Sequence, residues 1–596
     1  MFQIIKRLSK CVREYKRLSI ATLLFMVGEA AIECIIPYIT GKKLINAIQQ
    51  STGVDMHYIV KIGIILAIMA IVSLTCGGLA GLTAAKAGSG FAKNLRHDLF
   101  GKVQSFTFHN IDKFSSSSLV TRITTDVTNV QMSYMMLIRI AVRSPLMLIF
   151  SVGMAAYMGG WLAATFVVVI PLLAVGFILI FRKAMPAFRR VFKKYDRLNE
   201  SIEENVRGMR VVKGFSREDY EKEKFGKAAD SICEDFTKAE RIVAWNTPLM
   251  NFCMYFNMVF VLLMGSMLAI RYAGTSGVQV GQLSAMLQYG MQVLMSLMML
   301  SMIFVMITIS AESAKRICEV LDEEPDMSVS DDALTEVADG SVDFKGVSFK
   351  YSVEAQAFAL SGIDLHIPSG ATVGIIGGTG SSKSTLVQLI PRLYDATEGT
   401  VSVGGKDVKD YDLTVLRDAV AMVLQKNLLF SGTIRENLRW GNENATDEEL
   451  IAACRLAQAD DFIRSFPDGY DTHIEQGGTN VSGGQKQRLC IARALLKKPK
   501  ILILDDSTSA VDTKTDAMIR AGLRAYIPET TKIIIAQRIA SVMDADMIVV
   551  MDNGRIAAVG RHEELMKTSE IYREVYEEQT NGKGSDDHES QNDDAE

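Results

Sequence analysis

Six long apolar runs in the first half of the chain limit its possible folds more than any other feature of the sequence. A helix needs about 20 apolar residues to cross the ~30 Å hydrocarbon core of a bilayer, and each run meets that length. We therefore predict an all-α polytopic membrane domain with six transmembrane helices. The predicted helices are residues 18–40, 58–82, 134–158, 161–181, 247–270 and 281–308.

Basic residues are concentrated in the two long segments that separate the second run from the third and the fourth from the fifth. The later segment includes Arg182, Lys183, Arg189 and Arg190. Cytoplasmic segments of membrane proteins carry an excess of Lys and Arg, so both segments and both termini are predicted to be cytoplasmic. The basic stretch before residue 18 predicts an amphipathic lead-in to a retained first helix, without a cleavable signal peptide.

The two basic segments have a helical rather than a loop-like composition. No proline occurs between Pro37 and Pro145, and the periodic pattern of polar and apolar residues continues beyond the second run. An unbroken helix of ~50 residues is ~75 Å long at about 1.5 Å per residue. About 45 Å of such a helix would project beyond the hydrocarbon. We predict long cytoplasmic extensions that transmit motion, with a separate soluble helical insert as the alternative.

Charge and cysteine content argue against several classes of function. The net charge is only −4, so nucleic acid is not expected as a partner. The eight cysteines are scattered and form no C-x-x-C pair, which disfavours both a disulfide framework and a zinc site. The apolar runs instead predict the lipid bilayer as a partner.

The second half of the chain has the composition of a soluble domain. The predicted boundaries are 1–310 for the membrane domain, 311–340 for a charged linker and 341–580 for an α/β domain of the P-loop type. Residues 581–596 are acidic and lack aromatic side chains, which is typical of a disordered tail.

A glycine-rich turn between a predicted strand and a predicted helix is the candidate nucleotide site. It approaches the pattern G-x-x-x-x-G-K-[ST], in which backbone N–H groups and a helix N-terminus hold phosphates while the lysine neutralises their charge. Ser382 stands where the second glycine is expected, and it removes no backbone donor. Binding then survives if φ at Ser382 is negative. The residues of the turn are Gly377, Gly378, Thr379, Gly380, Ser381, Ser382, Lys383, Ser384 and Thr385.

Two further segments fit a site for phosphoryl transfer with ATP and Mg²⁺ as cofactors. The apolar run ILILDD at 501–506 predicts a buried strand that delivers a carboxylate to magnesium, with Asp505 as the ligand. Taken alone, this run is also consistent with a strand that simply ends in a polar cap. The stretch VSGGQKQR at 481–488 is a second glycine-rich turn that opens a helix and presents backbone donors to an anion.

In their order and spacing, these motifs resemble those of ATP-binding cassette (ABC) exporter half-transporters, over the whole chain except the tail. The resemblance implies that Tyr351 stacks on adenine and that Asp512 is the last residue of the D-loop motif. It also implies that Gln425 joins Ser384 and Asp505 around magnesium and senses the membrane domain. The segments near 108–118 and 207–218 resemble the coupling loops that touch the nucleotide domains.

The stretch VSGGQ resembles the signature motif of the family, with Val481 in place of the usual leucine. In such exporters two nucleotide domains enclose two ATP molecules, each between the P-loop of one chain and the signature of the other. The resemblance therefore implies a second half-transporter chain as partner, whose ATP this signature would contact. The signature residues are Ser482, Gly483, Gly484 and Gln485.

Two catalytic positions depart from the family pattern. The general base is usually a glutamate after the Walker B aspartate, but this chain has Asp506, whose carboxylate is one methylene shorter. The histidine that contacts the γ-phosphate is replaced by Gln537, which can donate a hydrogen bond but carries no charge. Losing a positioned base lowers a rate by roughly 10² to 10⁴. We predict a site that binds Mg-ATP and hydrolyses it poorly, in a heterodimer whose partner supplies the usual residues.

Two features of the apolar runs are candidates for contact with cargo. Methionine is flexible and polarizable, and a stripe of it at helical spacing suits varied apolar ligands, although ordinary helix packing explains the stripe as well. Two intramembrane carboxylates lie four residues apart, and they would meet a cationic cargo, pair with Arg139 or Arg143, or lie at the interface. The candidate cargo residues are Glu29, Glu33, Met291, Met295, Met298 and Met302.

The function expected from these features is ATP-driven export of small amphipathic compounds, drug-like or lipid-like, by alternating access. The expected location is the plasma (inner) membrane, with the nucleotide domain in the cytoplasm. The alternatives are a dedicated peptide or lipid exporter, a homodimer with slow ATPase activity, and an ATP-gated regulator or channel on the same scaffold. Fewer than 20 residues precede the first run, so no N-terminal peptidase domain is expected.

Overall fold

The structure is a computed structural model that describes residues 2–48, 55–271, 279–327, 332–352, 355–506 and 510–581. The chain divides into two compact units. The first comprises Met1–Gln104 and Ser116–Glu323, and the second comprises Ser105–Ser115 and Glu324–Glu596. Apart from its first residue, the acidic tail predicted at 581–596 lies outside the described residues.

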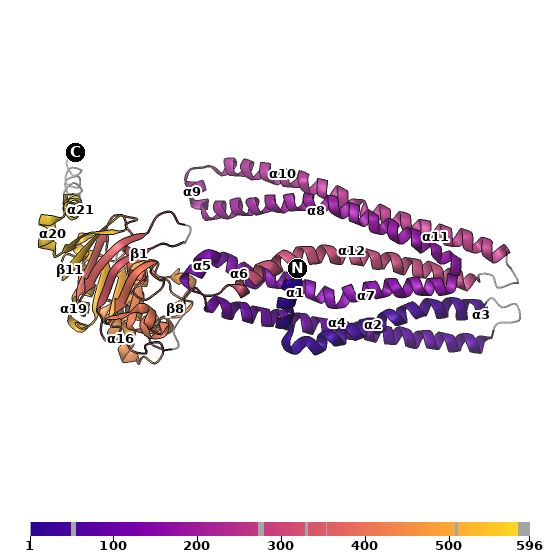
Figure 1. Ribbon diagram of the computed structural model, residues 1–596, viewed down its shortest axis with the longest axis horizontal. Coiled ribbons are helices and arrows are strands. Elements are labelled where there is room, and N and C mark those ends of the chain that lie inside the picture. The colour runs from indigo at the N-terminus through magenta and orange to yellow at the C-terminus, as the bar shows by residue number, and fades with distance from the viewer. Residues whose placement is uncertain are drawn as a thin grey trace. The chain divides into compact units, whose positions relative to one another are not determined.

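The described residues of the first unit form helices and no strands, and the main helices are long rods that lie side by side (Figure 1). Its elements are α1 (Phe2–Ser9), η1 (Lys10–Tyr15), α2 (Lys16–Tyr38), η2 (Ile39–Ile45), α3 (Asn46–Ile48), α4 (Met56–Gln104), α6 (Ser116–Thr121), η3 (Arg122–Asp126), α7 (Val127–Gly159), η4 (Gly160–Ala163), α8 (Ala164–Arg207), α9 (Met209–Gly214), α10 (Glu218–Ala244), α11 (Asn246–Arg271) and α12 (Val280–Asp322).

Five helical stretches of the described chain are long and apolar enough to cross a membrane. One of them, Ser116–Phe188, contains both the third and the fourth predicted spans. Between these two spans α7 ends at Gly159, and Gly160 has a φ of +52°, a conformation that glycine adopts without steric cost. Five spans are therefore established by length and composition, and the predicted count of six depends on dividing this stretch at Gly160.

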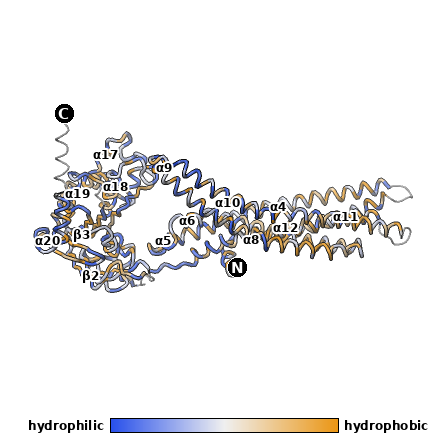
Figure 2. The backbone as a smooth tube through the Cα atoms, turned by 90° about the horizontal axis from the view of Figure 1, so that it is seen from above, coloured by the Kyte–Doolittle hydropathy of each residue, from blue (hydrophilic) through white to orange (hydrophobic). Residues whose placement is uncertain are grey.

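The prediction of long continuous helices is confirmed for α4. This helix runs for 49 residues without a break, which corresponds to about 74 Å. The second apolar run and the basic segment after it thus belong to one helix, so the alternative of a separate soluble insert is wrong for this segment. Figure 2 shows a similar change from hydrophobic to hydrophilic residues in α11 and α10. Hydrophobic residues lie along α11, and hydrophilic residues lie where α10 approaches α9.

The end of α12 differs from the sequence prediction. Residues 311–322, which were expected to belong to a linker, continue the helix as far as Asp322. Arg316 of this stretch donates from Nε to Asp126 Oδ2 over 2.8 Å, and Asp126 is fully buried. A buried carboxylate is stable when it is paired and hydrogen-bonded. This pairing helps to keep the charged end of α12 helical.

The second unit contains two main sheets. Its strands are β1 (Val342–Phe349), β2 (Leu360–Ile367), β3 (Thr372–Gly377), β4 (Glu398–Val403), β5 (Lys406–Asp407), β6 (Val420–Val423), β7 (Gly432–Thr433), β8 (His473–Ile474), β9 (Ile501–Asp505), β10 (Thr531–Ile535), β11 (Met547–Asp552) and β12 (Arg555–Gly560). An antiparallel sheet has the order β2-β1-β4-β5, and a six-stranded sheet has the order β12-β11-β3-β10-β9-β6. All neighbours in the second sheet are parallel except β11 and β12.

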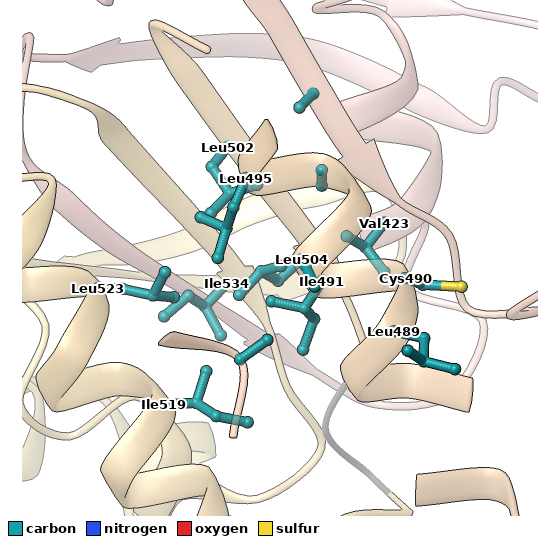
Figure 3. Close-up of a cluster of buried hydrophobic side chains, with 14 of the residues drawn as sticks. Val423, Leu489, Cys490, Ile491, Leu495, Leu502, Leu504, Ile519, Leu523 and Ile534 are labelled. Carbon is teal, nitrogen blue, oxygen red and sulfur yellow. The ribbon is translucent and has the colours of Figure 1, made fainter. Parts of the chain in front are cut away.

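The second unit also contains helices. They are α5 (Phe108–Phe114), α13 (Lys383–Gln388), η5 (Val408–Asp410), α14 (Leu413–Ala419), α15 (Ile434–Arg439), α16 (Asp447–Leu456), α17 (Asp460–Ser465), η6 (Gly469–Asp471), η7 (Gln476–Gly478), α18 (Gly483–Leu496), α19 (Thr513–Tyr526), η8 (Ile539–Ser541), α20 (His562–Thr568) and α21 (Glu570–Asn581). Figure 3 shows side chains of β9, β10, α18 and α19 in one buried cluster. Parallel strands are buried on both faces, which is why β9 reads as a continuous apolar run.

One short segment from the membrane half of the sequence belongs to the second unit. Residues Ser105–Ser115 include α5, although they lie within the predicted membrane domain 1–310. Asp112 Oδ2 accepts a 2.7 Å hydrogen bond from the Tyr394 hydroxyl, and the rings of Phe108 and Tyr394 meet edge to face at 5.9 Å. Of the two expected coupling loops, the first is thus largely part of the second unit, whereas 207–218 contains α9 in the first.

Candidate nucleotide site

The P-loop lies between β3 and α13, as its sequence predicts. Lys383, the first residue of α13, donates from Nζ to the carbonyl oxygens of Gly377 and Gly378, each over 2.8 Å. A Cβ added to Gly378 or Gly380 would meet no atom within 4 Å, so both glycines border open space. A backbone loop around open space, with a lysine across it, fits the phosphates of a nucleotide.

Ser382 has a left-handed backbone conformation. Its φ is +67° and its ψ is +27°, so the condition of a negative φ, under which binding was expected to survive, is not met. A side chain in this region costs roughly 1–2 kcal/mol because Cβ approaches the carbonyl oxygen. The loop keeps the shape that glycine would give it, and Ser382 adopts that shape at an energetic cost.

The pair Ser384 and Asp505 fits a magnesium ion. Asp505 ends β9 with only 3% of its surface exposed, and its Oδ1 accepts a 2.9 Å hydrogen bond from Ser384 Oγ. Hydroxyl and carboxylate oxygens are the ligands that Mg²⁺ prefers. Burial raises the pKa of Asp505, and the nearby Asp506 raises it further. A cation bound here would offset this cost of burying the charged carboxylate.

Three residues expected at the catalytic position lie together. Gln537 Nε2 donates to Asp506 Oδ2 over 2.9 Å, and Gln425 also hydrogen-bonds to this carboxylate. Burial raises the pKa of Asp506, while both hydrogen bonds and Lys383 counteract that shift. Asp506 has a φ of +48°, so this carboxylate too stands on backbone in the left-handed region.

Lys383 is the cation of the site. Burial lowers its pKa, and the carboxylates of Asp505 and Asp506 partly counteract that shift. Two acids and one ammonium group therefore share a small volume, and the guanidinium of Arg538 also favours the charged form of Asp506. This charge arrangement suits a bound magnesium–phosphate complex, whose phosphates take up the lysine charge while its metal takes up the carboxylates.

Tyr351 lies beside the P-loop helix. Its hydroxyl is 2.8 Å from the Thr385 hydroxyl, and its ring contacts Tyr394 edge to face at 5.3 Å. The Tyr351 ring is accessible from solvent, since 44% of the residue's surface is exposed. An exposed ring held next to the loop fits the expected stacking on a base.

The signature residues form a second cluster. Ser482 caps α18, since its Oγ accepts from Gln485 N and Gln485 Oε1 accepts from Ser482 N, over 3.3 and 2.9 Å. Gly484 leaves room for the Ala510 carbonyl, which a Cβ would approach to 2.8 Å. Asp512 caps α19, and hydrogen bonds from Thr515 lower its pKa. The signature turn and the Asp512 segment are therefore held against each other.

Two residues that touch this site were missed by the sequence reasoning. Tyr394 packs against Tyr351, and the side chain of Gln579 bonds to the backbone of Gln537 over 2.8 Å. Tyr394 lies in the stretch that follows the P-loop helix. Its position in the sequence is therefore a signal by which this aromatic residue could have been proposed as a neighbour of the site. Gln579 belongs to no motif, and only the approach of α21 reveals it.

The intramembrane carboxylates are paired in the structure. Arg143 Nη2 lies 2.6 Å from Glu33 Oε2 and 3.6 Å from Glu29 Oε1. Of the three readings left open for this pair, the geometry favours pairing with Arg143. A Cβ added to Gly77 would lie 3.1 Å from Glu29 Oε1, so the α4 backbone packs closely against this carboxylate.

The methionine stripe divides into two parts. Met298 and Met302 line a cavity of about 510 Å³ between α8, α10, α11 and α12, together with Phe177, Phe181 and Asn246 among others. Met291 and Met295 are 58% and 50% exposed and are not among the residues that line this cavity. Met298 and Met302 thus line the cavity and Met291 and Met295 do not, although Met302 is itself 54% exposed.

Comparison with known proteins agrees with both halves of the chain. Residues 18–316 match the family described as the ABC transporter transmembrane region, and residues 360–509 match the family described as ABC transporter. The chain is 35% identical to the uncharacterized ABC transporter ATP-binding protein YfiB of Bacillus subtilis (strain 168) over 576 residues, which cover 96% of this chain and 98% of that protein.

Two further similarities are informative. An ATP-dependent lipid A-core flippase of Desulfotalea psychrophila is 33% identical over 500 residues, with 82% of this chain and 85% of that protein covered. The structure of a bacterial Atm1-family ABC exporter with ATP bound superposes with a TM-score of 0.81, at 23% identity and with 94% and 98% of the two chains covered. With its helical membrane region, its P-loop and its signature turn, this chain belongs to the ABC transporter family, as a half-transporter whose transmembrane region is fused to an ABC ATPase domain.

Proposed function

We propose that this chain is one subunit of a heterodimeric exporter that moves amphipathic or hydrophobic compounds across the plasma membrane by alternating access. In this proposal its own P-loop site binds ATP and hydrolyses it poorly. The observation that carries the proposal is the short side chain of Asp506 together with its hydrogen bonds. A complete set of binding groups surrounds a shortened carboxylate that is already hydrogen-bonded to Gln537 and Gln425.

The binding role follows from the groups that remain. Lys383 and the backbone of 377–382 hold phosphates, Ser384 and Asp505 hold Mg²⁺, and Tyr351 supplies an aromatic face for the base. When bound, Mg²⁺ neutralises phosphate charge and orients the terminal phosphate. None of these tasks needs the residue after Asp505, so binding is expected to be retained.

The weak hydrolysis follows from the base. A general base must reach the attacking water within hydrogen-bond distance, and Asp506 is one methylene shorter than glutamate. Its Oδ2 also accepts from Gln537, whose amide cannot become charged. Together these features reduce both the reach and the availability of the carboxylate for abstracting a proton.

The membrane part of the proposal comprises six transmembrane helices, with a turn at Gly160, both termini and the ATPase domain in the cytoplasm, and a second half-transporter chain as partner. The cavity lined by Met298 and Met302 suits a small apolar or amphipathic cargo, because methionine adapts to varied shapes. The likeness to a lipid A-core flippase makes a lipid-like cargo a reasonable member of this class. Met291, Met295 and the paired Glu29 and Glu33 complete the proposed cargo-facing set.

The test is the ATPase rate of the full chain alone in lipid nanodiscs, beside the double variant Asp506→Glu, Gln537→His. We expect the native chain to bind ATP but turn it over slowly, and the double variant to be at least tenfold faster, because the loss of a positioned base costs roughly 10² to 10⁴ in rate. The single variant Asp506→Glu restores the general base without changing residue 537. Its rate therefore shows how much of the gain in the double variant comes from the base and how much from the γ-phosphate contact. Brisk hydrolysis by the native chain would identify a working homodimer and contradict the proposal.

A further inference from the structure

The C-terminal helix α21 reaches back to the loop that carries Gln537. Gln579, close to the end of this helix, donates from Nε2 to the Gln537 carbonyl over 2.8 Å and accepts at Oε1 from the Ile539 N–H over 2.9 Å. One side chain thus binds two backbone groups that lie two residues apart. Only a side chain with both a donor and an acceptor at its end can make this pair of bonds, as an amide can.

The body of α21 is firmly attached to the ATPase unit. Tyr572 is 1% exposed and belongs to the buried cluster that also contains Ile539. Its hydroxyl lies 2.8 Å from His562 Nδ1 of α20. Gln579 follows Tyr572 by seven residues, which is two helical turns, so both side chains project from the same face. The buried tyrosine therefore sets the position from which Gln579 reaches the loop.

The loop in turn holds the catalytic position. The Gln537 side chain donates to Asp506 Oδ2 over 2.9 Å, and Asp506 N donates to the Ile535 carbonyl over 3.0 Å. A continuous path of hydrogen bonds thus joins Gln579, the Gln537 backbone, the Gln537 amide and Asp506. Fixing the backbone at residues 537 and 539 limits where the Gln537 amide can point.

We propose that Gln579 is a positioning residue for the nucleotide site: its amide clamps the backbone at Gln537 and Ile539, and so aims the Gln537 side chain at the terminal phosphate of bound ATP. This inference rests on the proposed role of Gln537 as the residue that faces the γ-phosphate. The clamp therefore makes α21, the last helix of the described residues, part of the ATP site.

The test compares two fluorescent nucleotides on the full chain in nanodiscs. Mant-AMP-PNP has a γ-phosphate and is not hydrolysed, whereas mant-ADP lacks the γ-phosphate. We expect Gln579→Leu to raise the dissociation rate of mant-AMP-PNP roughly fivefold, which corresponds to the loss of about one hydrogen bond, and to leave that of mant-ADP within twofold. Glu578→Leu, at the exposed neighbouring position of α21, is the matched control and should change neither rate.

A double-mutant cycle shows whether Gln579 acts through Gln537. In a Gln537→Ala background, Gln579→Leu should no longer change the dissociation of mant-AMP-PNP, because the side chain that the clamp aims is absent. An undiminished effect in that background, or equal effects on the two nucleotides, would overturn the proposal. The readout is binding of an analogue that is not hydrolysed, so it stands apart from the ATPase test of the proposed function.

Hydrogen exchange keeps the proposal testable if Gln579→Leu disturbs folding. In Gln579→Glu the carboxylate can still accept from the Ile539 N–H but cannot donate to the Gln537 carbonyl. The Ile539 amide should stay protected in this variant, with the release of mant-AMP-PNP still faster than in the native chain. Amides of β10 report global unfolding and should be unchanged. Loss of protection at Ile539 in both variants, with native release rates, would show a purely structural contact.

Discussion

Two of the departures from the family pattern stand on backbone in the left-handed region. Ser382 has a φ of +67° and Asp506 a φ of +48°. Residues held in such conformations cost of order 1–3 kcal/mol and collect at functional sites, where the surroundings hold them in place. For Ser382 the surrounding loop has the shape of a phosphate cradle, so the conformation is set by the loop rather than by the preference of serine.

A substitution series at Ser382 separates the backbone from the hydroxyl. Ser382→Ala should be neutral to within ~0.5 kcal/mol, since it keeps Cβ and loses only the hydroxyl. Ser382→Val should cost at least ~1 kcal/mol more, because a β-branched residue tolerates positive φ poorly. The measurements are the thermal midpoint of the full chain and its affinity for mant-ATP. Equal values for the serine and valine chains would contradict the left-handed conformation.

The raised pKa of Asp506 predicts how nucleotide-free stability depends on pH. A carboxyl whose folded pKa lies above its unfolded value of about 3.9 binds more protons in the folded state, so stability falls as pH rises through this interval and stays lower above it. Asp506→Asn removes the buried charge and its repulsion with Asp505. We expect a thermal midpoint a few degrees higher at pH 7, and a smaller loss of stability between acidic and neutral pH, by calorimetry without nucleotide. A lower midpoint would contradict the cost of burying this charge.

At the scale of elements, α5 is joined to the ATPase unit by a small number of specific contacts. The Tyr394 hydroxyl donates to Asp112 over 2.7 Å, and Thr107 Oγ1 donates to Asp326 Oδ1 over 2.5 Å. Tyr394 is 8% exposed, and burial together with Asp112 raises the pKa of its hydroxyl, which stays protonated as the donor. Because the same ring touches Tyr351, Tyr394 connects the segment 105–115 to the surroundings of the P-loop.

This contact predicts a measurable coupling. In a double-mutant cycle of Tyr394→Phe and Asp112→Ala, we expect an interaction energy of about 1.5–3 kcal/mol in the unfolding of the full chain, the range for hydrogen bonds to charged groups. The control is Tyr411→Phe, which removes a buried hydroxyl that donates to the Val403 carbonyl over 2.9 Å, away from α5. Its cycle with Asp112→Ala should give a value near zero. Coupling at both tyrosines would show a general loss of stability instead.

At the scale of the whole molecule, the two nucleotide motifs of this chain have different proposed duties. Its P-loop would hold the slowly hydrolysed ATP, whereas its signature turn would face the ATP of the partner chain. The signature turn keeps Ser482, Gly483, Gly484 and Gln485, and Ser482 and Gln485 cap α18 reciprocally. A signature that keeps these residues, beside a base that is proposed to be weak, is the arrangement expected of a subunit that serves the site of its partner.

Mutations in the two motifs should therefore have unequal effects on the proposed heterodimer. Ser482→Ala removes a cap and a donor at the partner's site, and we expect ATPase activity to fall at least tenfold. Lys383→Ala should abolish ATP binding at this chain's own site while leaving a larger part of the turnover. The measurement is the ATPase rate of the complex purified through a tag on this chain. A greater loss with Lys383→Ala would mean that this chain's own site carries the turnover.

The sequence by itself determined the class of the protein and the position of its P-loop between a strand and a helix. Apolar runs of membrane-spanning length, the turn around Lys383, and the strand that ends at Asp505 are local patterns, and local patterns follow directly from residue order. The long helix α4 was predictable for the same reason. The count of six spans was not, because Gly160 divides a stretch that is apolar on both sides.

Only the tertiary structure decided which distant residues meet. The φ of Ser382 depends on the whole loop, and the assignment of 105–115 to the ATPase unit depends on Tyr394, almost 300 residues further along the chain. The helical continuation of 311–322 rests on the pairing of Arg316 with Asp126. Gln579 reaches residues 537 and 539 because Tyr572 anchors α21 in the core. These are contacts between segments far apart in sequence, and they are set by packing, which no local pattern encodes.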